Sequence, residues 1–142
     1  MRLWRLAATL LAAEIGVFTG YVSQTSLPTE MTPELYCLLF QKVRDNISVN
    51  VGARVDRVTQ LAGVDVICDR KALVFHHKVE LRLPQIDDGW LAQRQRRWSK
   101  SYCNRHPAFS NAISDGWKIS TILKLSDGTE FRIDAQCHDA EA

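Results

Sequence analysis

The chain has 142 residues and a formal net charge of +2; 46% of its residues are hydrophobic and 24% are charged. One ordinary domain takes ~100–150 residues, so this length excludes an enzyme that carries a separate cofactor-binding domain. The small net charge does not favour bulk binding of nucleic acid, and the sequence has no repeat or single-sign charge block that would indicate a solenoid or a long disordered tail.

An apolar run near the N-terminus predicts a segment that crosses the inner membrane. Residues 6–22 contain one charge, Glu14, and two arginines precede them. A helix over these residues would cover about 25 Å, slightly less than a ~30 Å hydrocarbon core. Basic residues before the run orient the N-terminus to the cytoplasm. We therefore expect residues 1–28 to form a single-pass hydrophobic helix and residues 29–142 to form a periplasmic domain.

A cleaved secretory signal is the alternative for the same segment. No small-x-small cleavage site follows the apolar run, which favours the anchor. A carboxylate within hydrocarbon is costly unless it meets a partner helix, and small residues would let such a helix approach closely. The residues expected at this membrane or partner helix are Trp4, Glu14, Gly16, Gly20 and Tyr21. Either alternative exports the domain.

Four cysteines, Cys37, Cys68, Cys103 and Cys137, follow the apolar segment. An even number of cysteines in a small exported domain predicts disulfides. Three pairings are possible, and the expected positions of the cysteines along the chain favour Cys37–Cys68 and Cys103–Cys137. Each bond would close a loop of a little over thirty residues, which contributes roughly 3–4 kcal/mol to stability.

A metal site is the alternative use of two of these cysteines. His106 follows Cys103, and His138 follows Cys137, so these four side chains could form a Cys2His2 tetrahedron if the chain brought them together. That site would require reduced thiols, which export opposes. No C-x-x-C pair or haem-attachment motif is present, and we expect no metal and no cofactor.

The first part of the exported domain predicts a helix followed by a strand. Thr32-Pro33-Glu34 is typical of a helix start. An apolar stripe then predicts an amphipathic helix that ends near residue 50, with its members at Leu35, Leu39, Val43 and Ile47. Residues 55–61 predict a strand that breaks at Ala62-Gly63, and residues 64–68 could continue the edge of a sheet.

The clearest pattern lies in residues 72–83, where apolar and polar side chains alternate. This period of two predicts an antiparallel strand that covers a core on one side. His76 and His77 fall on opposite faces, so one strand face cannot offer both to a metal. We expect His77 to be a half-buried histidine at the edge of the core.

After Pro84, an Asp87 or Asp88 cap predicts a second helix. No acidic residue occurs between Asp88 and Asp115, so this region is locally basic. It is either a solvated helix face or a surface for phospholipid head groups or an acidic partner. The residues expected at this basic surface are Arg94, Arg96, Arg97, Lys100 and Arg105.

The last part of the chain predicts a short helix and a hairpin. Residues 107–114 have a helical pattern closed by Asp115-Gly116, and residues 117–125 and 131–137 alternate on either side of a turn at 126–129. The expected fold class is therefore α+β, with helices packed on one face of a small antiparallel sheet.

The order of these elements resembles that of a family of small exported bacterial proteins described as quorum-sensing-regulated virulence-factor-like. The resemblance covers residues 33–137, and the motifs that carry it are Tyr102-Cys103-Asn104, the Asp127-Gly128 turn and the closing Cys137. It is more distantly similar to pilotin-like periplasmic proteins of type II secretion. The resemblance implies an α+β periplasmic domain with a Cys103–Cys137 bridge and no known catalytic residues. The chain departs from the pilotins by lacking a lipoprotein cysteine and by having the additional pair Cys37 and Cys68.

The sequence contains none of the motifs that would indicate a catalytic serine, a zinc protease, a phosphate-binding loop or a dinucleotide site. We therefore expect no enzyme and no catalytic residues. The predicted function is that of a membrane-tethered periplasmic interaction domain, an accessory or assembly factor of an envelope complex. Its expected partners are a membrane protein or envelope complex and the phospholipid bilayer, with no nucleic acid. The alternative is a secreted soluble effector or inhibitor that is released by signal cleavage.

Overall fold

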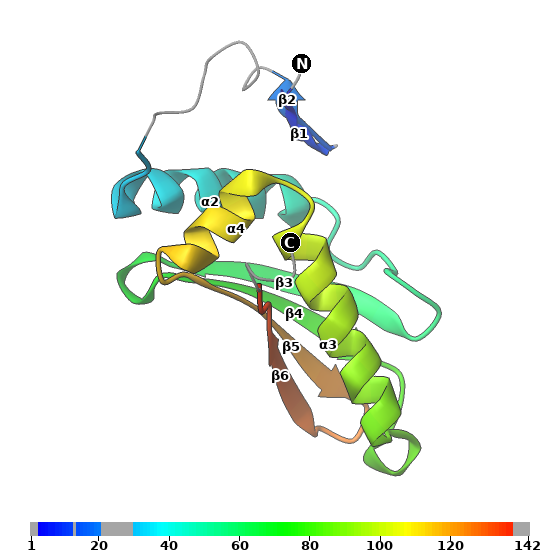
Figure 1. Ribbon diagram of the computed structural model, residues 1–142. Helices are drawn as coiled ribbons and strands as arrows, with labels where there is room; N and C mark the ends of the chain where they lie inside the picture. Colours follow the sequence, from blue (N-terminus) through cyan, green and yellow to red (C-terminus); the bar gives the residue numbers. More distant parts are fainter. Residues whose placement is uncertain (1–2, 13, 21–29, 138–142) are drawn as a thin grey trace. The chain divides into compact units, whose positions relative to one another are not determined.

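The computed structural model describes residues 3–12, 14–20 and 30–137, and it divides into two compact units, Met1–Thr32 and Pro33–Ala142 (Figure 1). The N-terminal unit is an antiparallel hairpin in which β1 (Leu3–Ala12) pairs with β2 (Glu14–Gly20). The second unit covers most of residues 29–142, which the sequence analysis assigns to a separate domain.

The prediction of an N-terminal hydrophobic helix is wrong, because β1 and β2 occupy that segment. Within the described ranges no helix has the length and apolar character needed to cross a bilayer. A continuous apolar run fits a strand as well as a helix, so hydropathy alone does not choose between them. Thr9, Ile15 and Val17 have β-branched side chains, which favour extended backbone.

Three helices and four strands make up the second unit. Along the chain they are α2 (Pro33–Ser48), β3 (Thr59–Ile67), β4 (Ala72–Val79), α3 (Asp88–Cys103), α4 (Pro107–Ser114), β5 (Lys118–Leu125) and β6 (Glu130–Asp134). Two short 3₁₀ turns, η1 (Cys68–Arg70) and η2 (Leu83–Gln85), follow β3 and β4.

The sheet has the order β3-β4-β5-β6 and is mixed, not purely antiparallel as predicted. The pairs β3–β4 and β5–β6 are antiparallel, whereas β4 and β5 run parallel. The reason lies in the connection from β4 to β5, which contains both α3 and α4. A connection of this length can carry the chain back to the other end of the sheet, so the next strand enters in the same direction.

β3 differs from its predicted form at both ends. It begins at Thr59 rather than Val55, because residues 54–58 turn back on it and Val55 N–H donates to the Thr59 carbonyl at 2.9 Å. It also continues through Ala62-Gly63, where the register with β4 shifts as in a β-bulge. The extra residue lets the strand keep its pairing instead of ending there.

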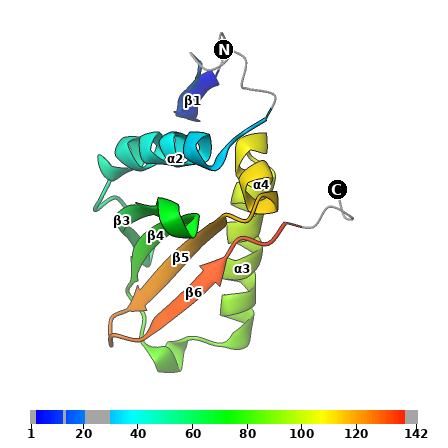
Figure 2. The same cartoon turned by 90° about the vertical axis from the view of Figure 1, so that its left-hand side faces the viewer.

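The helices lie on one face of the sheet and enclose the core with it (Figures 1 and 2). The strand register places Leu73, Phe75, Ile119 and Leu123 on the face turned to the helices, and all four are buried. On α2 the buried side chains are Tyr36 and Phe40. The predicted stripe was therefore displaced by one residue, since the aromatic rings and not the neighbouring leucines face the centre of the core.

Aromatic rings form a continuous chain of contacts through this core. Phe40 stacks on Phe109 with ring centroids 5.9 Å apart, and Phe109 meets Tyr102 edge-on at 5.1 Å. Tyr102 then contacts Trp98 at 4.7 Å, and Trp98 contacts Phe75 at 5.2 Å. Each such pair adds ~0.5–1.5 kcal/mol to stability beyond the burial of its area. These ring contacts therefore join α2, α4, α3 and β4 into one core.

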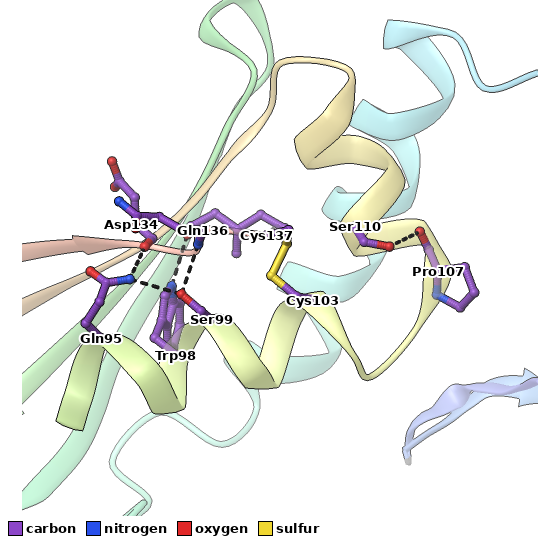
Figure 3. The surroundings of a disulfide bond; sticks show 10 residues. Gln95, Trp98, Ser99, Cys103, Pro107, Ser110, Asp134, Gln136 and Cys137 are labelled. Atoms are coloured by element: carbon purple, nitrogen blue, oxygen red, sulfur yellow. Dashed lines mark hydrogen bonds between the residues drawn. A yellow bond between two sulfur atoms is a disulfide. The ribbon is translucent and has the colours of Figure 1, made fainter. Parts of the chain in front are cut away.

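Two disulfides fasten the periphery of this domain, in the pairs that the sequence analysis favoured. Cys37 of α2 is joined to Cys68 of η1, and Cys103 at the end of α3 to Cys137 after β6. Figure 3 shows hydrogen bonds beside the second bond: Gln95 donates to the Asp134 carbonyl at 2.7 Å, and the Gln136 N–H donates to the Ser99 hydroxyl at 2.9 Å. The segment after β6 is therefore held along α3 by both kinds of bond.

Candidate functional site: a cleft between helix α3 and the sheet

A cleft of about 460 Å³ opens between α3, the end of α2, the loop before β3 and the helix face of the sheet. This volume lies within the range of small-ligand pockets, ~300–1,000 Å³. The residues that line it are Ile47, Val55, Asp56, Thr59, Leu61, Phe75, His77, Arg94, Arg97, Trp98, Ser101, Tyr102, Arg105, Thr121, Leu123 and Ile133.

The floor of the cleft is apolar because it is the helix face of the sheet. Leu61, Phe75, Leu123 and Ile133 come from four adjacent strands, and all are buried. Val55 also lines the cleft and, unlike the floor residues, is exposed over 56% of its surface.

His77 is the titratable group at the centre of the floor. It is 8% exposed, and its Nδ1 lies 2.7 Å from the Thr121 hydroxyl on the neighbouring strand β5. Burial, the largest cause, and the positive charge of Arg94 together lower the pKa of His77 to about 4, against the opposing effect of Asp56. The imidazole is therefore neutral at neutral pH. The sequence predicted a half-buried histidine, whereas the structure places it within the core.

Arg94 and Asp56 join α3 to the loop before β3 across one end of the cleft. Arg94 Nη1 lies 2.9 Å from Asp56 Oδ2, and the Arg94 guanidinium also lies over the Trp90 ring at 4.5 Å. Partial burial raises the pKa of Asp56, but the Val58 N–H and the Arg94 charge outweigh this, so the pKa is below its usual value. The Asp56 carboxylate is therefore ionised at neutral pH, and its ion pair with Arg94 leaves little net charge at this end of the cleft.

The other basic residues of α3, and Arg105 just after its end, behave differently from Arg94. Arg97 and Arg105 line the cleft, and both are exposed. A shallower hollow continues from them over the end of α3, and its lining residues are Arg97, Lys100, Ser101, Asn104 and Arg105. Arg96 is exposed on the same helix and lines neither hollow. The predicted basic surface is thus divided into an ion-paired arginine, a basic wall beside the cleft and a separate exposed arginine.

The structure does not bring the proposed Cys2His2 set together as a metal site. Cys103 and Cys137 share a disulfide, so neither sulfur offers a thiolate. His106 caps the N-terminus of α4 by accepting from the Ala108 N–H at 3.0 Å, and His138 lies outside the described residues. In the described part of the chain, no three histidine, cysteine, aspartate or glutamate side chains are grouped as metal ligands would be.

The residues predicted for a membrane or partner helix do not form one. Trp4 lies in β1, and Glu14, Gly16 and Gly20 lie in β2, while Tyr21 lies outside the described residues. His76, the neighbour of His77 in β4, lies on the opposite face of the sheet from the helices. Its Nε2 lies 3.0 Å from Asp65 Oδ2, so it takes no part in the cleft.

Sequence reasoning missed Asp56 and Thr121 as parts of the site. The position of His77 on the core face was a signal for its burial, since its neighbours in the alternating pattern are Phe75 and Val79. Thr121 faces His77 only because β5 runs parallel to β4, which the sequence analysis did not predict. Asp56 lies in an irregular loop, where no periodic pattern indicates a partner.

Two solved structures share this fold. One is a protein from Pseudomonas aeruginosa that is assigned provisionally as secreted; the match has a TM-score of 0.55 and 13% sequence identity, and covers 76% of this chain and 96% of that one. The other is the pilotin of the type 2 secretion system of Vibrio vulnificus, with a TM-score of 0.54, 11% identity and coverage of 76% of this chain and 92% of that one. No protein-family model and no curated protein matches the chain.

These likenesses establish an α+β fold that is shared with a pilotin, at identities too low to carry function. The expected single-pass location in the inner membrane is wrong: the helix on which it rested is absent from the described residues, and one structural neighbour is assigned to the secreted proteins. The prediction failed because an apolar run indicates burial but does not determine whether the backbone is helical or extended.

Proposed function

We propose that this chain is an exported, soluble, non-enzymatic protein that acts outside the cytoplasm by binding, as an accessory factor or secreted effector of the bacterial envelope. Its N-terminal segment acts as a secretory signal that is removed, rather than as a lasting anchor. The observation that carries the proposal is the pair of disulfides, Cys37–Cys68 and Cys103–Cys137, which includes all four cysteines of the chain.

The disulfides support export because they persist in oxidising compartments and are rare in the cytosol. The structural neighbours support the same location, one being assigned as secreted and the other belonging to a secretion system. The basic N-terminus and apolar run that precede the domain are the general features of a secretory signal.

The chemistry of the cleft supports binding over catalysis. General acid–base catalysis works best when a group titrates near the operating pH, whereas the pKa of His77 is held at about 4 and its Nδ1 is bonded to Thr121. Arg94 and Asp56 are paired with each other. The titratable groups His77, Arg94 and Asp56 thus interact with protein partners, while the basic wall is exposed to a ligand.

Expression of the full chain in a Gram-negative host tests the export half of this proposal. We expect the protein in the periplasm or the medium, with an N-terminus between Tyr21 and Leu27 and a mass four protons below that of the reduced chain. A control variant without residues 2–22 should remain in the cytoplasm with four alkylatable thiols. Full-length protein that keeps Met1 in the membrane fraction, or reduced protein in the cytoplasm, would contradict the proposal.

A pull-down of the exported protein tests the binding half. We expect Arg97→Glu to reduce recovery of any stoichiometric partner, because it reverses a charge on the basic wall, whereas Arg96→Glu on the same helix should leave recovery unchanged. Equal effects of the two substitutions would indicate a nonspecific dependence on helix charge. Turnover of a substrate by the purified protein that is lost on His77→Gln would contradict the non-enzymatic assignment.

A further inference from the structure

The cleft between α3 and the sheet combines an apolar floor with positive charge on one wall, at two arginines that pair with no acidic side chain among the described residues. We propose that it binds a long-chain carboxylate, with the hydrocarbon chain over the floor and the carboxylate at Arg97 and Arg105. This inference goes beyond the proposed function, because it concerns the folded domain and does not depend on where the protein is located.

The floor has the character and size that a hydrocarbon chain requires. Its apolar residues are contributed by all four strands, and the space is about 460 Å³. Each methylene that leaves water for such a surface strengthens binding roughly fourfold. The methylene groups of a twelve-carbon chain that lie over the floor therefore contribute affinity without needing any polar partner.

The charges of the cleft favour an anion at one place on its wall. Arg97 and Ser101 lie one helical turn apart on α3, and Arg105 follows two residues after the helix ends at Cys103; all three line the cleft. Asp56 is the acidic residue among those that line the cleft, and it is ion-paired with Arg94. Neither Arg97 nor Arg105 forms an ion pair with another described residue, and guanidinium groups bind carboxylates in a bidentate geometry.

An extended peptide fits the same cleft less well. Its backbone N–H and C=O groups would all need hydrogen-bond partners on being buried, whereas His77 and Thr121 already bond to each other and the Thr59 hydroxyl is the one buried lining group without a partner in the described residues. A hydrocarbon chain carries no such groups. The polar demand of the ligand is then confined to its carboxylate, which is where the arginines lie.

Calorimetric titration of the purified full chain with dodecanoate, below its micelle concentration, tests the proposal. We expect saturable binding of one dodecanoate, weakened about tenfold or more in an Arg97→Gln/Arg105→Gln variant, since a hydrogen bond to a charged group commonly accounts for a factor of this size. Arg96→Gln, the matched control, should bind within twofold of the unchanged chain. Dodecanol should bind more weakly than dodecanoate to the unchanged chain. Dodecanol should bind to the double variant as tightly as it binds to the unchanged chain.

A photoreactive dodecanoate analogue then locates the site. We expect crosslinks in residues 47–61 and 94–105, which carry the walls of the cleft. Crosslinks confined to residues 1–29 would overturn the proposal, as would dodecanol binding as tightly as dodecanoate. Absence of saturable dodecanoate binding would also overturn it. If the pull-down then recovered an acidic protein with the unchanged chain but not with the arginine variants, the occupant of the cleft would be a protein segment. None of these outcomes depends on the export experiment.

Discussion

His77 is the residue whose ionisation depends most directly on the fold. In an unfolded chain a histidine has a pKa of about 6.5, whereas burial and the Arg94 charge lower the pKa of His77 to about 4 in the folded domain. Between these values the unfolded chain binds a proton that the folded chain does not. The free energy of unfolding must therefore fall as the pH falls from about 6.5 to 4.

We expect this loss to approach 1.4 kcal/mol per pH unit from His77 alone within that window. Urea unfolding at pH 7.0, 5.5 and 4.5 measures it. His77→Gln should flatten the dependence, leaving the smaller contribution of His106, whose pKa is also lowered by burial. An unchanged slope in His77→Gln would show that His77 is already protonated in the folded state.

Tyr36 provides a second residue-scale prediction, because its hydroxyl donates to Asp115 Oδ2 at 2.8 Å and so links α2 to the end of α4. Tyr36→Phe keeps the ring among Phe40 and Trp117 but removes this bond. We expect a loss of about 1–2 kcal/mol in the free energy of unfolding, in the range for a bond to a charged group near the surface. A double-mutant cycle with Asp115→Asn measures the coupling, and fully additive losses would contradict a direct interaction.

At the scale of elements, the start of α3 distinguishes two residues that the sequence left as alternatives. Asp87 is the N-cap, with its carboxylate accepting from the Trp90 N–H at 2.7 Å, and Asp88 is the first helical residue. Asp87→Ala should therefore cost about 1 kcal/mol in the free energy of unfolding. Asp88→Ala loses only a favourable interaction with the helix dipole and should cost less. Equal losses would mean that the cap bond is not formed in solution.

Elements with a clear period were predictable from the sequence. Residues 107–114, bounded by Pro107 and Asp115-Gly116, form the expected helix α4, and the Asp127-Gly128 turn joins β5 to β6. The N-terminal segment and the strand pairing were not predictable in this way. Hydropathy does not separate a helix from a strand in an apolar run, and local patterns carry no information on which strands become neighbours across a long connection.

The candidate site was less predictable than the fold for a related reason. Arg97 and Arg105 were recognised as basic, because charge is visible in the sequence. Pairing was not visible: Arg94 has the same residue type, yet Asp56 neutralises it from a loop 38 positions away. The difference between a free and a paired arginine depends on tertiary contacts, and the cleft itself exists only once α3 lies across the sheet.

At the scale of the whole molecule, the two disulfides are independent constraints on one domain. They close the loops 37–68 and 103–137, which do not overlap and have sequence separations of 31 and 34 residues. Loops of this length predict similar contributions to stability, about 3–4 kcal/mol each. Because the loops are separate, their contributions should add.

We therefore expect Cys37→Ala/Cys68→Ala and Cys103→Ala/Cys137→Ala each to lower the free energy of unfolding by about 3–4 kcal/mol, and the chain without any cysteine to lose about 6–8 kcal/mol. A typical domain has 5–15 kcal/mol in total, so either bond alone should keep the domain folded while loss of both brings it near its unfolding midpoint. Urea unfolding of the four forms at neutral pH measures this. If loss of both bonds cost no more than loss of one, the two loops would be restricting the same conformational freedom of the unfolded chain, and either bond alone would then give the domain its full stability.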